Sequence, residues 1–172
     1  MTVEDPLGPG AGQSASFDEA RYRSVLGHFA TGVTVVSAMD GGEPVGLSVN
    51  SFTSASLDPP LVAFCAAKTS STWPRIREAG RFTVNVLAEH QATVSRVFAT
   101  HRDDKYEGLR WSPAPSGAPV LEGVLAWVDC TIEAEHDAGD HVLVLGRVND
   151  LDVVDEGGPL IFYRGGYGRI ER

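Results

Sequence analysis

A polar stretch at residues 46–60 carries a dense set of side chains that can form hydrogen bonds. An apolar, β-prone run at residues 45–49 overlaps its start and another at residues 61–65 follows its end; both are typical of buried strands. Its hydroxyl and amide side chains are Ser48, Asn50, Ser51, Thr53, Ser54 and Ser56. Neutral donors and acceptors at this density suit a flat polar ligand, while an ordinary serine-rich loop of similar composition is the alternative.

A second polar cluster stands at the start of a predicted helix. Thr72 or Ser71 is a suitable N-cap, Pro74 suits the first helical turn, and the helix is expected to end at Gly80. Backbone N–H groups at such a helix start favour a phosphate group. The side chains nearby that would support it are Lys68, Ser70, Ser71 and Arg75. A capped helix with solvated basic residues is the alternative.

The sequence lacks the common motifs for nucleotide binding, nucleophilic catalysis and metal binding. It holds no Gly-x-Gly-x-x-Gly turn between a strand and a helix, no P-loop, no nucleophile elbow and no cysteine or histidine cluster at metal-ligand spacing. Cys65 and Cys130 lie in predicted strands, which indicates buried free thiols. Ligand-holding segments without an acid, base or nucleophile suit a reaction whose chemistry is carried by a cofactor.

Composition and charge narrow the class of protein. A chain of 172 residues with 42% apolar and 22% charged residues fits one globular domain. The formal net charge of −9 argues against nonspecific binding to nucleic acid or to an anionic membrane surface. No run approaches the roughly 20 apolar residues of a membrane-spanning helix, and no signal-peptide pattern opens the chain, so we expect a cytoplasmic protein.

The elements that must position the two polar clusters are mainly short strands. Strands are expected over residues 33–38, 45–49, 61–65, 81–87, 124–134, 142–148, 151–154 and 159–163. Two amphipathic helices are expected, one from a capping box at Ser16 and Glu19 to about Gly32, and one over residues 91–99. Residues 1–15 are expected to be a disordered tail and residues 16–172 a single, mainly β domain with an antiparallel barrel and peripheral helices.

Five stretches, in this order, resemble the flavin reductase family. They are residues 29–36 (FATGVTVV), 46–60 (with NSFTS and DPP), 80–87 (GRFTVNVL), 139–141 (GDH) and 163–167 (YRGGY). The resemblance covers residues 20–168 and implies a split β-barrel of the FMN-binding, Greek-key type and a homodimer. It also implies NADH-dependent reduction of FMN or FAD by hydride transfer, with delivery of the reduced flavin to a partner monooxygenase.

The same resemblance implies roles for individual residues. Those implied for flavin are Ser48, Val49, Asn50, Ser51, Ser54, Lys68, Ser70, Ser71, Thr72, Asn85, Arg96 and Phe98. Residues 48–51 would border the isoalloxazine ring and residues 70–72 would take phosphate. Toward the phosphate or adenosine end would lie Lys68, Asn85, Arg96 and Phe98. Those implied for the nicotinamide nucleotide are His141, Tyr163, Arg164, Gly165, Gly166 and Tyr167. His141 is the expected catalytic residue, as a stacking or hydrogen-bonding group, and no metal site is expected.

The residues alone leave alternatives open. His141 follows a Gly-Asp turn and can simply cap a strand, and Tyr163 and Tyr167 can be core and rim aromatics. A flavin- or haem-binding carrier or sensor on the same barrel, without NADH turnover, is the alternative function. A reductase with a metal chelate as its acceptor is a third. The sequence does not distinguish FMN from FAD or NADH from NADPH.

Overall fold

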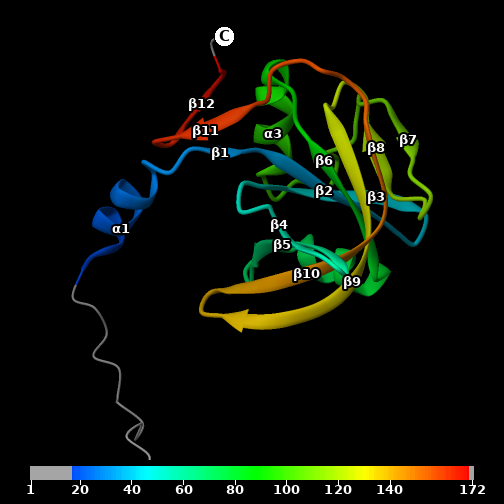
Figure 1. Ribbon diagram of the computed structural model, residues 1–172, viewed down its shortest axis with the longest axis horizontal. Helices are drawn as coiled ribbons and strands as arrows, with labels where there is room; N and C mark the ends of the chain where they lie inside the picture. Colours follow the sequence, from blue (N-terminus) through cyan, green and yellow to red (C-terminus); the bar gives the residue numbers. More distant parts are fainter. Residues whose placement is uncertain (1–16, 171–172) are drawn as a thin grey trace, which may run out of the picture.

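The computed structural model describes residues 17–170, which form a strongly curved antiparallel sheet with short helices around it (Figure 1). The helices are α1 Glu19–Leu26, α2 Trp73–Ala79 and α3 Ala92–Phe98, with a 3-10 turn, η1 Glu89–Gln91, directly before α3. The tail predicted at residues 1–15 lies outside the described residues. Strands predominate, which confirms the prediction of a mainly β fold with peripheral helices.

Seven strands make up the main sheet, in the order β3-β2-β6-β9-β10-β5-β4, and each neighbouring pair is antiparallel. Their bounds are β2 Thr34–Asp40, β3 Glu43–Val49, β4 Thr53–Leu57, β5 Pro60–Ala67, β6 Arg81–Val86, β9 Ala126–Ala138 and β10 His141–Val153. A second sheet joins β1 Thr31–Gly32, β11 Ile161–Tyr163 and β12 Gly166–Gly168, and a hairpin joins β7 Trp111–Pro113 to β8 Pro119–Leu121.

The main sheet curls until its two edges approach each other. Its edge strands, β3 and β4, are consecutive in the chain, so the short link at residues 50–52 must pass from one edge to the other. In that link the Ser51 hydroxyl accepts a hydrogen bond from the Cys65 N–H of β5, with 2.8 Å between the atoms. A seam therefore runs between β3 and β5, which lie close together without being neighbours in the sheet. This is the split barrel that the sequence predicted.

Apolar side chains pack against both faces of the sheet. On the inner face the ring centroid of Phe64 lies 5.7 Å from that of Trp73 and 5.4 Å from that of Phe82, both edge to face. On the outer face α3 and the β7–β8 hairpin cover a second core around Phe98. Because strand side chains alternate between faces, β2 presents Val36 to the first core and Val35 to the second. Two buried faces hold the site-bearing strands in place.

Several predicted boundaries are wrong at the N-terminal end. The first helix begins at Glu19, and its N-cap is Asp18, whose carboxylate accepts a hydrogen bond from the Arg21 N–H at 2.7 Å. The capping box predicted at Ser16 is therefore wrong, and Ser16 itself lies outside the described residues. The helix ends at Leu26 rather than near Gly32, because Gly32 and its neighbour leave to pair with β11.

Long-range strand pairing explains the remaining differences. Residues 53–57, which were not among the predicted strands, form β4 because they pair with β5. Residues 141–153 form one strand with a bulge between Val148 and Asp150, where the sequence predicted two strands. Residues 111–121 form the β7–β8 hairpin, which was not among the predicted strands.

Candidate functional site

A pocket of about 370 Å³ opens at the seam of the barrel. Its walls come from the ends of β3 and β5, the segment before α2, the segment after α3 and the start of β10. The volume lies within the roughly 300–1,000 Å³ that is typical of small-molecule sites. The predicted site residues that meet in its wall are Ser48, Val49, Asn50, Ser51, Ser70, Thr72, Phe98 and His141. Members of both polar clusters of the sequence thus face one cavity.

One end of the pocket is formed where β3 leaves the sheet. The ladder between β2 and β3 ends at the pair Thr34 and Val49, and the Thr34 hydroxyl donates to the Val49 carbonyl at 3.0 Å. Asn50 and Ser51 continue past this point as exposed residues on the pocket rim. Their polar groups lie beyond the last β2 partner, so a flat polar ligand can reach this strand end.

The other end is formed by hydroxyl groups just before α2. The Ser70 hydroxyl oxygen accepts hydrogen bonds from the Thr72 and Trp73 N–H groups, at 3.2 and 3.1 Å. The Thr72 hydroxyl oxygen accepts one from the Lys105 ammonium at 3.2 Å. Because a hydroxyl carries one hydrogen, and these oxygens serve the protein as acceptors, both hydrogens remain to donate into the pocket. Such donors suit an anionic group, which can only accept hydrogen bonds.

Lys105 is a pocket residue that the sequence did not indicate. Only 5% of its surface is exposed, and its ammonium also donates to the carbonyls of Gly46 and Phe98, at 3.1 and 3.3 Å. It therefore ties together β3, the start of α2 and the end of α3. Burial lowers the pKa of Lys105, while Asp103 acts in the opposite direction. A buried cation in a chain of net charge −9 is a local attraction for an anion.

A glycine allows this junction to form. A Cβ atom at Gly46 would lie 2.7 Å from Cε1 of Phe98 and 2.9 Å from the hydroxyl of Tyr106, closer than van der Waals contact allows. The Phe98 and Tyr106 rings meet edge to face at 5.0 Å, and the Tyr106 hydroxyl donates to the Val45 carbonyl at 3.1 Å. The pocket wall after α3 can approach β3 only because residue 46 has no side chain.

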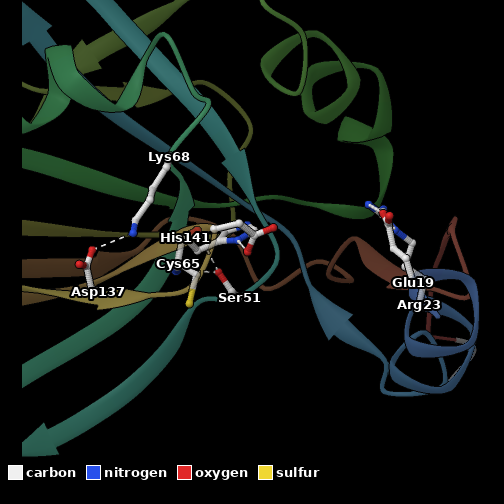
Figure 2. A network of polar contacts seen from close by, with 8 residues as sticks. Glu19, Arg23, Ser51, Cys65, Lys68, Asp137 and His141 are labelled. Atoms are coloured by element: carbon white, nitrogen blue, oxygen red, sulfur yellow. Dashed lines mark hydrogen bonds and ion pairs between the residues drawn. The ribbon is translucent and has the colours of Figure 1, made fainter. Parts of the chain in front are cut away.

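His141 stands at the rim, at the first position of β10 (Figure 2). Its Nδ1 lies 2.8 Å from a carboxylate oxygen of Asp140, and this contact lowers the pKa of Asp140. The ring is thereby oriented with Nε2 as its remaining polar atom. In Figure 2 His141 lies close to Ser51 and Cys65, so it faces the strand end where β3 leaves the sheet.

Some predicted flavin residues lie away from the pocket wall. Lys68 is exposed and its ammonium contacts an Asp137 carboxylate oxygen at 2.9 Å, as Figure 2 shows. Ser54 is exposed on β4, and Ser71 lines a smaller neighbouring hollow. Arg96 is exposed on α3, with its guanidinium carbon 5.0 Å from the ring centroid of Tyr167. Of the cations expected at the phosphate end, the structure places neither Lys68 nor Arg96 in the wall.

Asn85 is part of the core rather than of the pocket. It is fully buried on β6, and its amide nitrogen donates to the Val35 and Pro119 carbonyls and to the Ser37 hydroxyl, at 3.1–3.2 Å. Its amide oxygen accepts a hydrogen bond from the Leu121 N–H at 2.8 Å. These bonds use the side chain's hydrogen-bonding capacity to join β2, β6 and β8, which leaves little for a ligand.

The predicted nicotinamide segment forms the hairpin of β11 and β12. Tyr163, Arg164, Gly165 and Gly166 are exposed in it, and the φ angles of +48° at Arg164 and +79° at Gly165 define the turn. These residues and Tyr167 lie outside the wall of the seam pocket. Tyr167 is half-buried, and its hydroxyl lies 2.8 Å from that of Ser95 on α3.

A model of the flavin reductase like domain matches residues 26–171. The chain belongs to the flavin reductase family. It is 47% identical over 169 residues to the reductase subunit HsaB of a flavin-dependent monooxygenase from Rhodococcus jostii, a match that covers 98% of this chain and 87% of that protein. Its relatives include a flavin reductase from Pseudomonas putida and the FMN reductase (NADH) SmoA from Agrobacterium fabrum, and this chain is an NAD(P)H:flavin oxidoreductase.

Solved structures agree with this assignment. Nitrilotriacetate monooxygenase component B from Mycobacterium thermoresistibile superposes with a TM-score of 0.86 at 46% identity, covering 89% of this chain and 87% of that one. The NADH:FAD oxidoreductase SgcE6 from Streptomyces globisporus, in complex with NAD and FAD fragments, gives a TM-score of 0.84 at 37% identity, with 90% and 93% covered.

Residues 17–170 contain no group of three or more His, Cys, Asp or Glu side chains that could hold a metal ion. Within the same range no helix has the length and apolar character needed to cross a membrane.

Proposed function

We propose that this flavin reductase catalyses the NADH-dependent reduction of FMN or FAD and supplies the reduced flavin to a flavin-dependent monooxygenase. The observation that carries the proposal is the seam pocket. At one end it has the uncharged polar groups at the end of β3, and at the other it has the hydroxyls of Ser70 and Thr72 beside the Lys105 ammonium. The relative from Rhodococcus jostii is itself a monooxygenase reductase subunit, which supports the role in a two-component system.

The donor set fits a flavin mononucleotide unit. The hydroxyls of Ser70 and Thr72, with the positive charge of Lys105 behind them, would hold the phosphate. The end of β3, from Ser48 to Ser51, would border the ring, with backbone and hydroxyl groups as partners for its polar edge. Phe98 would pack against the ligand from the α3 side. The predicted roles of Ser70, Thr72 and residues 48–51 are retained in this proposal, and Lys105 replaces Lys68.

Positioning is the chemical task that this proposal gives to the protein. Bound flavin supplies the ring that accepts a hydride from the nicotinamide, so no acid or base from the protein is needed in that step. His141 would hold the nicotinamide by stacking or through Nε2, because Asp140 fixes the other ring nitrogen. The exposed residues 163–166 would lie toward the rest of the nucleotide. Holding the flavin and nicotinamide rings in van der Waals contact makes hydride transfer effectively unimolecular, so it no longer depends on a chance collision in the right orientation.

The pocket suits a flavin that enters and leaves. Several wall residues are exposed to solvent, among them Asn50, Ser51 and Thr100. An accessible wall allows the reduced flavin to pass to a partner enzyme. A flavin- or haem-binding carrier is not favoured, since the relatives are reductases.

A homodimer is also part of the proposal. None of the residues of α1 is buried within residues 17–170, although Tyr22, Val25, Leu26 and Phe29 follow a helical apolar stripe. Phe29 is 75% exposed. Together with Tyr22 and Leu26 it lines a groove of about 840 Å³, which shares Asn50 and Ser51 with the seam pocket. Figure 1 shows α1 standing apart from the barrel. A second copy of the chain would cover this surface. Light scattering would measure the molar mass of the protein in solution and so test for the dimer.

Anaerobic mixing experiments test the activity. Purified protein with NADH is expected to bleach the visible absorbance of added FMN or FAD, with no NADH oxidation when flavin is left out. Controls contain flavin and NADH without protein, and NADPH in place of NADH. No bleaching with either flavin and either nucleotide would overturn the proposal, and flavin binding without bleaching would identify a carrier.

A further inference from the structure

Three hydroxyl groups from distant parts of the chain form a continuous row that ends at the pocket. The Ser48 hydroxyl of β3 lies 2.9 Å from the Ser95 hydroxyl of α3, which lies 2.8 Å from the Tyr167 hydroxyl of β12. Both distances are typical of O–H···O hydrogen bonds. Ser48 is a wall residue of the seam pocket, whereas Tyr167 belongs to the C-terminal hairpin outside it.

The row is held in place from both sides. Ser95 is 1% exposed, so it is shielded from competing water. The Tyr167 ring packs edge to face on Phe162 with 5.6 Å between centroids, and the Arg96 guanidinium carbon lies 5.0 Å from the Tyr167 ring centroid. Figure 1 shows β12 beside α3 at one end of the molecule. The phenol hydroxyl is thus fixed against Ser95 by packing on its ring.

The chemistry of the three groups favours one direction for the hydrogens. A phenol is a more acidic, stronger donor than an alkyl hydroxyl. Tyr167 is then the donor to Ser95, and Ser95 is the donor to Ser48. In this arrangement the Ser48 oxygen is occupied as an acceptor, and its own hydrogen is directed away from Ser95, toward the pocket.

We propose that Tyr167 is a positioning residue for the flavin site: through Ser95 it holds the Ser48 hydroxyl as a hydrogen-bond donor toward the ring end of the pocket. The inference rests on the proposed flavin binding. It moves Tyr167 from the nicotinamide side, where the family resemblance put it, to the flavin side. It also links the C-terminal hairpin to the flavin pocket through Tyr167 and Ser48, which are more than 100 residues apart in the chain.

Flavin titrations of Tyr167→Phe test the inference. The variant keeps the ring and its contacts with Phe162 and Arg96 but lacks the donor hydroxyl. The dissociation constants of FMN and of riboflavin are expected to rise equally, by about three- to ten-fold, because the lost hydrogen bond acts at the ring and not at the phosphate. The KM for NADH, measured at saturating flavin, is expected to stay unchanged.

Two further variants make the test specific. Ser95→Ala is expected to weaken flavin binding by a similar factor, and the double variant by no more than the larger single effect, because both changes break the same row. Tyr163→Phe, which removes a phenol hydroxyl from the same hairpin but outside the row, is expected to leave flavin affinity unchanged. Unchanged flavin affinity in Tyr167→Phe, a selective rise in the NADH KM, or additive effects of the two changes would overturn the inference.

A ligand-free measurement separates this inference from the proposed function. The unfolding free energies of Ser48→Ala, Tyr167→Phe and the double variant are expected to be non-additive without any flavin. If the wild-type protein bound no flavin, the proposed function would fail, and this cycle would still show whether the hydroxyls are coupled. Additive unfolding energies would overturn the row itself.

Discussion

Replacing Lys105 by methionine tests the electrostatic basis of the seam pocket. The substitution keeps the length of the side chain and removes its charge and all three hydrogen bonds, to the Gly46 carbonyl, the Thr72 hydroxyl and the Phe98 carbonyl. Lys68→Met is the matched control, because Lys68 is the other lysine of the chain and lies outside the pocket wall. Both variants change the net charge equally.

The expected loss of affinity follows from the distance between charges. The Lys105 ammonium lies 3.2 Å from the Thr72 hydroxyl oxygen. An acceptor bound to that hydroxyl lies up to about 6 Å from the ammonium. At an effective dielectric constant of about 20–40, a unit charge at that distance is attracted by about 1.4–2.8 kcal/mol. FMN binding is therefore expected to weaken by about 10- to 100-fold in Lys105→Met, and riboflavin binding, which involves no phosphate, by much less.

The same substitution is expected to destabilise the fold. It leaves two buried carbonyl oxygens without their donor, which costs about 1–3 kcal/mol of stability each. It also removes the cost of burying an ammonium group, which stabilises the variant. A net loss of about 2 kcal/mol corresponds to a melting temperature lower by about 4–8 °C. Lys68→Met breaks only an exposed ion pair and is expected to change stability by less than about 1 kcal/mol.

The pH dependence of stability and of FMN affinity provides an independent test of the role of Lys105. Burial lowers the pKa of Lys105 in the folded chain below its ordinary value of 10.5. Between these two pKa values the unfolded chain binds more protons, so Lys105 makes stability rise with pH. The attraction for phosphate needs the charged form, so FMN affinity is expected to fall as pH rises through the folded pKa, in wild type but not in Lys105→Met.

Fluorescence titrations with FMN and riboflavin, together with thermal unfolding of the ligand-free protein, check all of these quantities. Equal losses for FMN and riboflavin would show that Lys105 shapes the pocket without attracting the phosphate. A loss in Lys68→Met as large as that in Lys105→Met would refute the assignment, because it would show a general charge effect or a phosphate site at Lys68.

Two further predictions separate ligand contacts from core contacts. His141→Ala is expected to raise the KM for NADH several-fold with a small fall in kcat and to leave the FMN dissociation constant unchanged. Steady-state kinetics and FMN titration measure these quantities. A loss of FMN affinity would contradict the assignment of His141 to the nicotinamide side. Asn85→Ala removes the acceptor of the Leu121 N–H and a donor to the Val35 and Pro119 carbonyls, so it is expected to destabilise the fold by about 3 kcal/mol or more in denaturant titrations. Flavin affinity of the folded variant should be unchanged.

The sequence was sufficient where a feature depends on neighbouring residues. The second helix was predicted correctly, with Pro74 in the first turn and Gly80 in the left-handed conformation at the end, because capping and turn preferences are local. The strand ends that form the pocket were also predicted, since polar residues interrupt apolar strands there. Thr72 is the N-cap residue, as predicted, but the side chain that accepts hydrogen bonds from the first N–H groups is that of Ser70.

The sequence was insufficient where a feature depends on distant residues. Asn85 interrupts the apolar side of a strand, a pattern that fits either a ligand contact or a core amide. Its partners Pro119 and Leu121 lie more than 30 residues away, and only their positions show that the amide joins strands. Lys105 lies among charged residues that predict a solvated loop. Its burial depends on Gly46 and Phe98 meeting around it, which no local pattern encodes.

The seam of the barrel explains why the site lies where it does. A closed barrel uses its edge groups in hydrogen bonds between strands, but β3 and β5 approach without pairing. Backbone and hydroxyl groups at the end of β3 are therefore left for a ligand, and such an opening needs support from elsewhere. Lys105 supplies that support by joining three segments around the pocket, and the absence of a side chain at Gly46 lets them come together. A reaction in which the cofactor carries the chemistry depends on this kind of fixed geometry more than on an acid or base, so variants that move the walls are expected to affect it more than variants that change surface charge.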